Sequence, residues 1–77
     1  MLYSDILKEL RGDRGITQSQ MGARLGISQS TYSDYENGVR EMPLAMLTLL
    51  AEILNTSTDY ILGRTAVQTP YPRRNHA

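Results

Sequence analysis

A short polar segment near the middle of the chain carries side chains suited to recognising a hydrogen-bonding partner. If the segment is helical, one face of the helix presents Gln29, Ser30, Ser33, Asp34 and Asn37. Amides and hydroxyls donate and accept hydrogen bonds, as the edges of nucleic-acid bases do. A helix face exposed only to solvent usually carries Lys and Glu instead. The pattern therefore favours base recognition, with an ordinary solvated face as the alternative.

Two short helices joined by a glycine corner are expected to position this face. Thr17 caps a helix over residues 18–25, and Gly26 supplies the left-handed conformation that ends it. Ser28 caps a second helix, which runs to about Asn37.

This stretch resembles the helix-turn-helix of the phage-repressor and Cro-like group, the Xre family. The matching residues are Thr17-Gln18, Met21-Gly22, Leu25-Gly26-Ile27-Ser28, Ser30-Thr31, Tyr35-Glu36-Asn37-Gly38 and Arg40. The resemblance extends to residues 44–54 and 57–63, so it covers about residues 4–64. It implies a compact all-α domain of five helices that binds double-stranded DNA, with helices two and three as the helix-turn-helix.

The polar residues then take expected roles. The base-reading side chains are expected to be Gln29, Ser30, Ser33 and Asp34. Gln29 is the best candidate, because its amide can pair with adenine through two hydrogen bonds. The resemblance implies phosphate contacts from Gln18, Thr31, Asn37 and Arg40, and Arg14 is a further candidate. Gln18 has an alternative role as a plain helix-start residue.

Arg11 and Glu36 are the pair that the resemblance implies lies between the first and third helices. The alternative is two unrelated surface charges. Two positions depart from the family pattern. Gly22 stands where alanine is usual, which predicts a close approach of the two motif helices. Tyr32 stands where Ile or Val is common, and both Tyr32 and Tyr35 are interpreted as packing residues.

Three further helices complete the predicted domain. Residues 2–12 form the first, with Ser4 as its cap. Residues 43–54 form a nearly apolar helix. The main apolar stripe of that helix consists of Leu44, Leu47, Leu50 and Leu54. A last short helix follows Ser57 and ends at Gly63.

The domain is expected to span residues 1–64, and residues 65–77 are expected to form an extended or disordered tail without apolar periodicity. Arg73 and Arg74 could reach DNA as a basic arm. Two arginines are a weak signal, so a solvated tail is the preferred interpretation. His76 stands alone and builds no metal site.

Composition limits the classes of protein that fit. The chain has 77 residues, no cysteine, and eight basic against eight acidic residues, for a formal net charge of zero. The absence of cysteine excludes a disulfide scaffold and a thiolate metal site. No apolar run approaches the ~20 residues of a membrane span, and no signal peptide is evident, so a cytoplasmic protein is expected.

Zero net charge counts against nucleic-acid binding and predicts weak non-specific binding to DNA. The main alternative is therefore a protein-interaction module, such as an antitoxin-like or adaptor domain. That alternative is favoured by an apolar surplus at Leu49, Ile53, Ile61 and Leu62. An enzyme is a poor fit, because no nucleophile–base pair or glycine-rich phosphate loop is present. We expect a transcriptional repressor that binds a palindromic operator as a homodimer, without cofactor, metal, membrane or small-molecule ligand.

Overall fold

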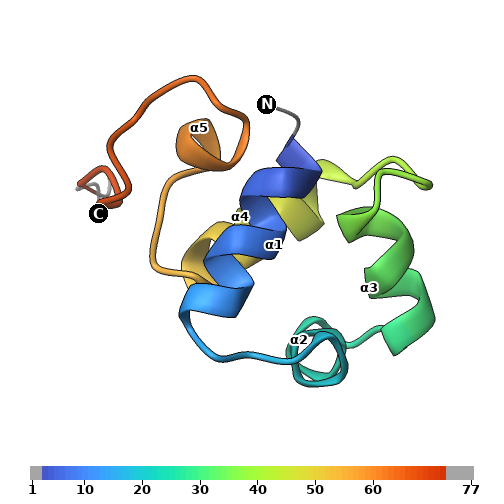
Figure 1. Ribbon diagram of the computed structural model, residues 1–77. Coiled ribbons are helices and arrows are strands. Elements are labelled where there is room, and N and C mark those ends of the chain that lie inside the picture. Colours follow the sequence, from blue (N-terminus) through green and yellow to red (C-terminus); the bar gives the residue numbers. More distant parts are fainter. Residues whose placement is uncertain (1–2, 73–77) are drawn as a thin grey trace, which may run out of the picture.

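The computed structural model describes residues 3–72 of the chain, and in that range it contains helices and no strand. The helices are α1 (Tyr3–Asp13), α2 (Gln18–Leu25), α3 (Gln29–Glu36), α4 (Leu44–Ile53) and α5 (Thr58–Ile61). The predicted all-α, five-helix fold is confirmed. In Figure 1, α1 and α4 lie in the centre, α3 lies at the right with α2 below it, and α5 with residues 64–72 lies at the left.

Aliphatic side chains from every helix but α3 build the core, which α3 joins through an aromatic ring. Leu7 and Leu10 of α1, Leu50 of α4 and Ile61 of α5 are almost completely buried. Tyr32 of α3 is also fully buried in the same cluster. No helix in the described range is long and apolar enough to cross a membrane.

The predicted close approach of α2 and α3 occurs at Gly22. A Cβ atom at this position would lie 3.0 Å from the carbonyl oxygen of Ile27 and 3.2 Å from that of Ser28. It would also lie 3.3 Å from the backbone nitrogen of Gln29, the first residue of α3. Because all three neighbours are backbone atoms, they cannot move aside as a flexible side chain would. The absence of a side chain at Gly22 therefore allows the first residue of α3 to lie close to the backbone of α2.

Three sequence expectations at the helix ends are wrong. Ser4 is not a cap, because it lies inside α1 and is buried near Gly38. Leu44 does not join the buried stripe of α4, since it is the first residue of the helix and is 77% exposed. Ile61 adds nothing to an apolar surface, because it is completely buried. Periodicity identifies one face of a helix, but not whether the core reaches its first turn.

The segment after α5 has no helix but is held to the domain by side-chain hydrogen bonds. The Thr56 hydroxyl donates to the carbonyl oxygen of Gln68 at 2.5 Å. The Gln68 amide donates to the Tyr60 hydroxyl at 3.1 Å. The Tyr71 hydroxyl donates to the Asp59 carboxylate at 3.2 Å. The candidate basic arm at Arg73 and Arg74, and His76, lie outside the described residues.

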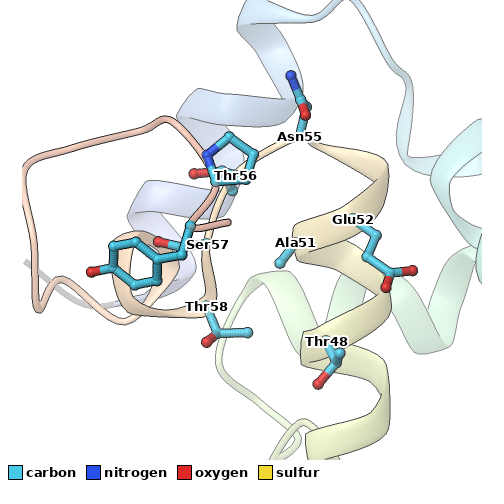
Figure 2. Close-up of a pocket in the computed structure, with 9 residues that line it drawn as sticks. Thr48, Ala51, Glu52, Asn55, Thr56, Ser57 and Thr58 are labelled. Atoms are coloured by element: carbon cyan, nitrogen blue, oxygen red, sulfur yellow. The ribbon is translucent and has the colours of Figure 1, made fainter. Parts of the chain in front are cut away.

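A hollow of about 430 Å³ lies between α4 and this segment. Figure 2 shows Thr48, Ala51 and Glu52 on α4, with Thr56, Ser57 and Thr58 on the stretch that leads into α5. Pro70 and Tyr71 also line it. The two buried hydroxyls in its wall already have partners. Thr56 is bonded to Gln68, and Ser57 accepts a hydrogen bond from the backbone nitrogen of Tyr60.

We expect Gly22→Ala to destabilise the domain although alanine is the better helix former. Alanine gains about 0.5–1 kcal/mol of helix propensity, but forcing a methyl group against backbone atoms costs about 1–3 kcal/mol. Gly12→Ala in α1 is the matched control, because nothing lies within 4 Å of its added Cβ. Urea unfolding should show a lower midpoint for Gly22→Ala and a higher one for Gly12→Ala. Equal stabilisation by both would contradict the close approach.

Candidate nucleic-acid interface

Side-chain caps fix the starts of both helices that carry the candidate interface. The Thr17 hydroxyl accepts from the backbone nitrogen of Gln20 at 3.0 Å, and the Gln20 side chain accepts from that of Thr17 at 2.9 Å. This is the predicted capping box. Gly26 then turns the chain with a φ of 72°, and Ser28 caps α3 by accepting from the backbone nitrogen of Thr31 at 3.1 Å. The corner between the helices is thus defined by local hydrogen bonds and one left-handed glycine.

The proposed base-reading residues come together around one hollow. It has a volume of about 280 Å³ and lies where the start of α2 faces α3. Its lining residues are Gln18, Gln29, Ser30, Ser33 and Asp34. The four base-reading candidates are therefore neighbours in space, and Gln18, expected as a phosphate contact or as a plain helix-start residue, lies beside them. This wall offers amides, hydroxyls and one carboxylate, so it can both donate and accept hydrogen bonds.

A bidentate ion pair contacts one of the residues that line this hollow. Arg11 Nε donates to Glu36 Oε2 at 2.8 Å, and Arg11 Nη2 donates to Glu36 Oε1 at 2.9 Å. The remaining donor group, Arg11 Nη1, reaches the carbonyl oxygen of Ile16 at 2.8 Å. The Glu36 side chain is 1% exposed and that of Arg11 20%. The pair is thus shielded from water and joins α1 to the end of α3.

Gln18 extends this network to α2. Its Nε2 atom donates to Glu36 Oε1 at 3.2 Å. Burial opposes the ionisation of Glu36, but the hydrogen bonds and charge of Arg11, together with the nearby Tyr32 hydroxyl and the Gln18 amide, outweigh it and hold the pKa of Glu36 below its ordinary value. Glu36 is therefore a buried carboxylate, with donors from two other helices.

Tyr32 packs against the same network. Its ring is fully buried, and its hydroxyl is the buried side-chain group in the described range that lacks a well-formed hydrogen bond. Burial raises the pKa of Tyr32, and the neighbouring Glu36 carboxylate raises it further. The hydroxyl therefore stays neutral. Tyr35 is also buried, so both tyrosines are packing residues, as interpreted from the sequence.

The other phosphate-contact candidates lie outside the hollow. Thr31 is half-buried at the start of α3, where its hydroxyl accepts from Ser28 at 2.9 Å. Asn37 follows α3, and its amide donates to the Ser33 hydroxyl at 3.1 Å. This bond links a phosphate candidate to a base-reading candidate, which the sequence did not suggest. Arg14 and Arg40 are exposed, before α2 and after α3 respectively.

Two capped helices around a left-handed glycine corner, with a polar hollow on the second helix, define a helix-turn-helix domain. A helix-turn-helix family model matches residues 7–61, and the chain belongs to this family. The resemblance to the phage-repressor group is confirmed. The findings thus point to a family of DNA-binding transcription regulators and not to an enzyme family.

Several known proteins are similar to this chain. The uncharacterized HTH-type transcriptional regulator YobD of Bacillus subtilis (strain 168) is 35% identical over 75 residues, which cover 97% of this chain and 67% of YobD. The HTH-type transcriptional regulator AnsR of the same strain is 36% identical over 69 residues, covering 90% of this chain and 60% of AnsR. The chain thus spans about half to two thirds of the length of the curated relatives it matches.

The fold is also similar to that of a solved repressor. The crystal structure of the P22 c2 repressor protein in complex with synthetic operator 9T, determined in the presence of Tl⁺, matches with a TM-score of 0.77 and 26% identity. The match covers 84% of this chain and 98% of that one.

We expect Arg11→Met to destabilise the domain by about 3–5 kcal/mol, because it leaves the Glu36 carboxylate buried without its cation. Arg11→Met combined with Glu36→Leu should recover most of that loss, since apolar residues often replace a buried ion pair without cost. Urea unfolding at pH 7 measures both. An Arg11→Met protein as stable as the wild type would show that the pair contributes nothing.

The lowered pKa of Glu36 predicts that the stability difference between the wild type and the double variant depends on pH. The pKa of Glu36 is lowered in the folded protein, so the stability it contributes is fully present above the ordinary glutamate pKa. That contribution is lost as the pH falls below about 4.3, toward the lowered value. The stability difference between the wild type and Arg11→Met/Glu36→Leu should therefore shift against the wild type in acid. A difference that stays constant from pH 7 to pH 3 would contradict this.

Proposed function

We propose that this protein binds double-stranded DNA in a sequence-specific manner, as a bacterial or phage transcriptional repressor that acts in the cytoplasm. The observation that carries the proposal is the hollow in which Gln18 of α2 meets four polar side chains of α3. The similarity of the chain to regulators such as YobD and AnsR supports the same function. So does the similarity of its fold to that of a repressor whose structure was determined in complex with an operator.

In the proposed mechanism, the domain recognises DNA by placing α3 against the edges of the bases. The start of α3 enters the major groove, and α2 crosses the sugar–phosphate backbone. Gln29 reads a base edge, with adenine as the preferred partner for its amide. Ser30 and Ser33 each donate or accept, and Asp34 accepts from a cytosine amine. Phosphate contacts position the domain on the duplex without reading its sequence.

Phosphate contacts come from Gln18 at the start of α2 and from four residues outside the hollow. The first backbone N–H groups of α2 favour an anion, and Gln18 lies beside them. The other candidates are Arg14 before α2, Thr31 within α3, and Asn37 and Arg40 after α3. Each arginine that neutralises a phosphate adds to affinity and to its dependence on salt.

The active form is a homodimer on a palindromic operator, because one domain reads too few base pairs to bind tightly alone. A two-fold dimer needs a self-complementary surface. A candidate lies at the turn between α3 and α4 and the first residue of α4, where Val39 is 76% and Leu44 77% exposed. Leu62, 45% exposed, borders a neighbouring hollow of about 190 Å³. This exposed apolar turn is therefore assigned to a second copy of the chain.

Selection of bound DNA from a genomic library tests the base-reading assignment. The wild type should enrich a palindrome at both low and physiological salt, and Gln29→Ala combined with Ser33→Ala should lose it. Arg40→Ala should instead weaken binding to all sequences and reduce the salt slope by about 0.9, as expected for one lost phosphate contact. The absence of any enriched sequence for the wild type would favour the protein-interaction module.

The dimer surface has its own test. Leu44→Glu should leave the unfolding midpoint nearly unchanged, because Leu44 is largely exposed. It should weaken binding to the palindrome at least tenfold while leaving half-site binding unchanged, because two charges would meet across the two-fold axis. Sedimentation on full-site and half-site duplexes measures the stoichiometry. Two Leu44→Glu molecules bound as tightly as the wild type would contradict this surface.

A further inference from the structure

One oxygen of the buried Glu36 carboxylate accepts hydrogen bonds from two other helices. Glu36 Oε1 accepts from Arg11 Nη2 at 2.9 Å and from Gln18 Nε2 at 3.2 Å. Gln18 is also a lining residue of the hollow that contains the base-reading candidates. The same side chain therefore contacts the buried ion pair on one side and the proposed DNA surface on the other.

The chemistry of the partners determines how Gln18 is oriented. An ionised carboxylate only accepts hydrogen bonds, so the NH₂ group of Gln18 must face Glu36 and its carbonyl oxygen cannot. This leaves Gln18 one N–H donor and its carbonyl oxygen for contacts in the hollow. Gln20, two residues later, is oriented the other way, because its side-chain oxygen accepts from the backbone of Thr17. The two amides of α2 are thus fixed by different partners.

We propose that Glu36 is a positioning residue for DNA binding, which holds the Gln18 amide in one orientation so that its free N–H meets a backbone phosphate. This inference rests on the proposed function. An amide that is oriented before binding loses less rotamer freedom when it contacts DNA. Arg11 balances the charge of Glu36, so the carboxylate orients Gln18 without strongly repelling the phosphates. The ion pair thus acts on the interface as well as on stability.

A double-mutant cycle tests the coupling. Dissociation constants for the selected DNA site are measured with Gln18→Ala in two backgrounds, the wild type and Arg11→Met/Glu36→Leu. In the wild-type background the substitution should weaken binding about tenfold, because a hydrogen bond to a charged phosphate is lost. In the Arg11→Met/Glu36→Leu background, where no carboxylate holds the Gln18 amide, Gln18→Ala should weaken binding less than threefold. Gln20→Ala is the matched control and should cost the same factor in both backgrounds.

The outcomes separate this inference from the function on which it rests. Equal factors for Gln18→Ala in both backgrounds, with normal wild-type binding, would overturn the positioning role alone. A wild type that selects no DNA would overturn the proposed function and this inference with it.

A second measurement covers the case in which the Arg11→Met/Glu36→Leu protein does not fold. In the wild-type protein, NMR should show one Gln18 side-chain amide proton exchanging with solvent at least several-fold more slowly than those of Gln20. Equal exchange at the two side chains would overturn the positioning role.

Discussion

The buried ion pair between Arg11 and Glu36 is the interaction on which this small domain depends most. It joins α1 to the end of α3, and the Gln18 amide extends it to α2. A carboxylate that is 1% exposed is tolerable only because its oxygens receive charged and polar donors. The Glu36 carboxylate therefore fixes the relative positions of α1, α2 and α3 by hydrogen bonds.

The geometry of the interface follows from a second constraint, the space between α2 and α3. Gly22 has no room for a Cβ atom, because the backbone that starts α3 lies against it. Gly26 turns the chain in the left-handed region, and Ser28 ends the turn by capping α3. With no side chain between them, the start of α2 and the polar face of α3 approach closely enough to share one hollow.

Charge distribution explains how a chain of zero net charge remains compatible with the proposed DNA binding. The charge of Glu36 is balanced by Arg11, so Glu36 adds no unbalanced negative charge beside Gln18. Arg14, before α2 in the sequence, and Arg40, after α3, are both exposed. Few phosphates are neutralised by such a surface, so the proposed affinity depends largely on hydrogen bonds. Among residues 3–72, the buried side-chain group without a hydrogen-bond partner is the Tyr32 hydroxyl, which burial keeps neutral.

The sequence by itself determined the elements that local chemistry defines. The capping box at Thr17, the left-handed corner at Gly26 and the bounds of α2 depend on neighbouring residues, so short-range patterns predicted them. Tertiary structure decided the features that depend on distant segments. It exposed Leu44, although the spacing of this residue matches an apolar stripe, and it buried Ser4 and Ile61. It also bonded Gln68 and Tyr71, in a segment without apolar periodicity, to residues 56–60. It also joined Gln18 to Glu36, since a hydrogen bond between residues 18 apart exists only after the helices have packed.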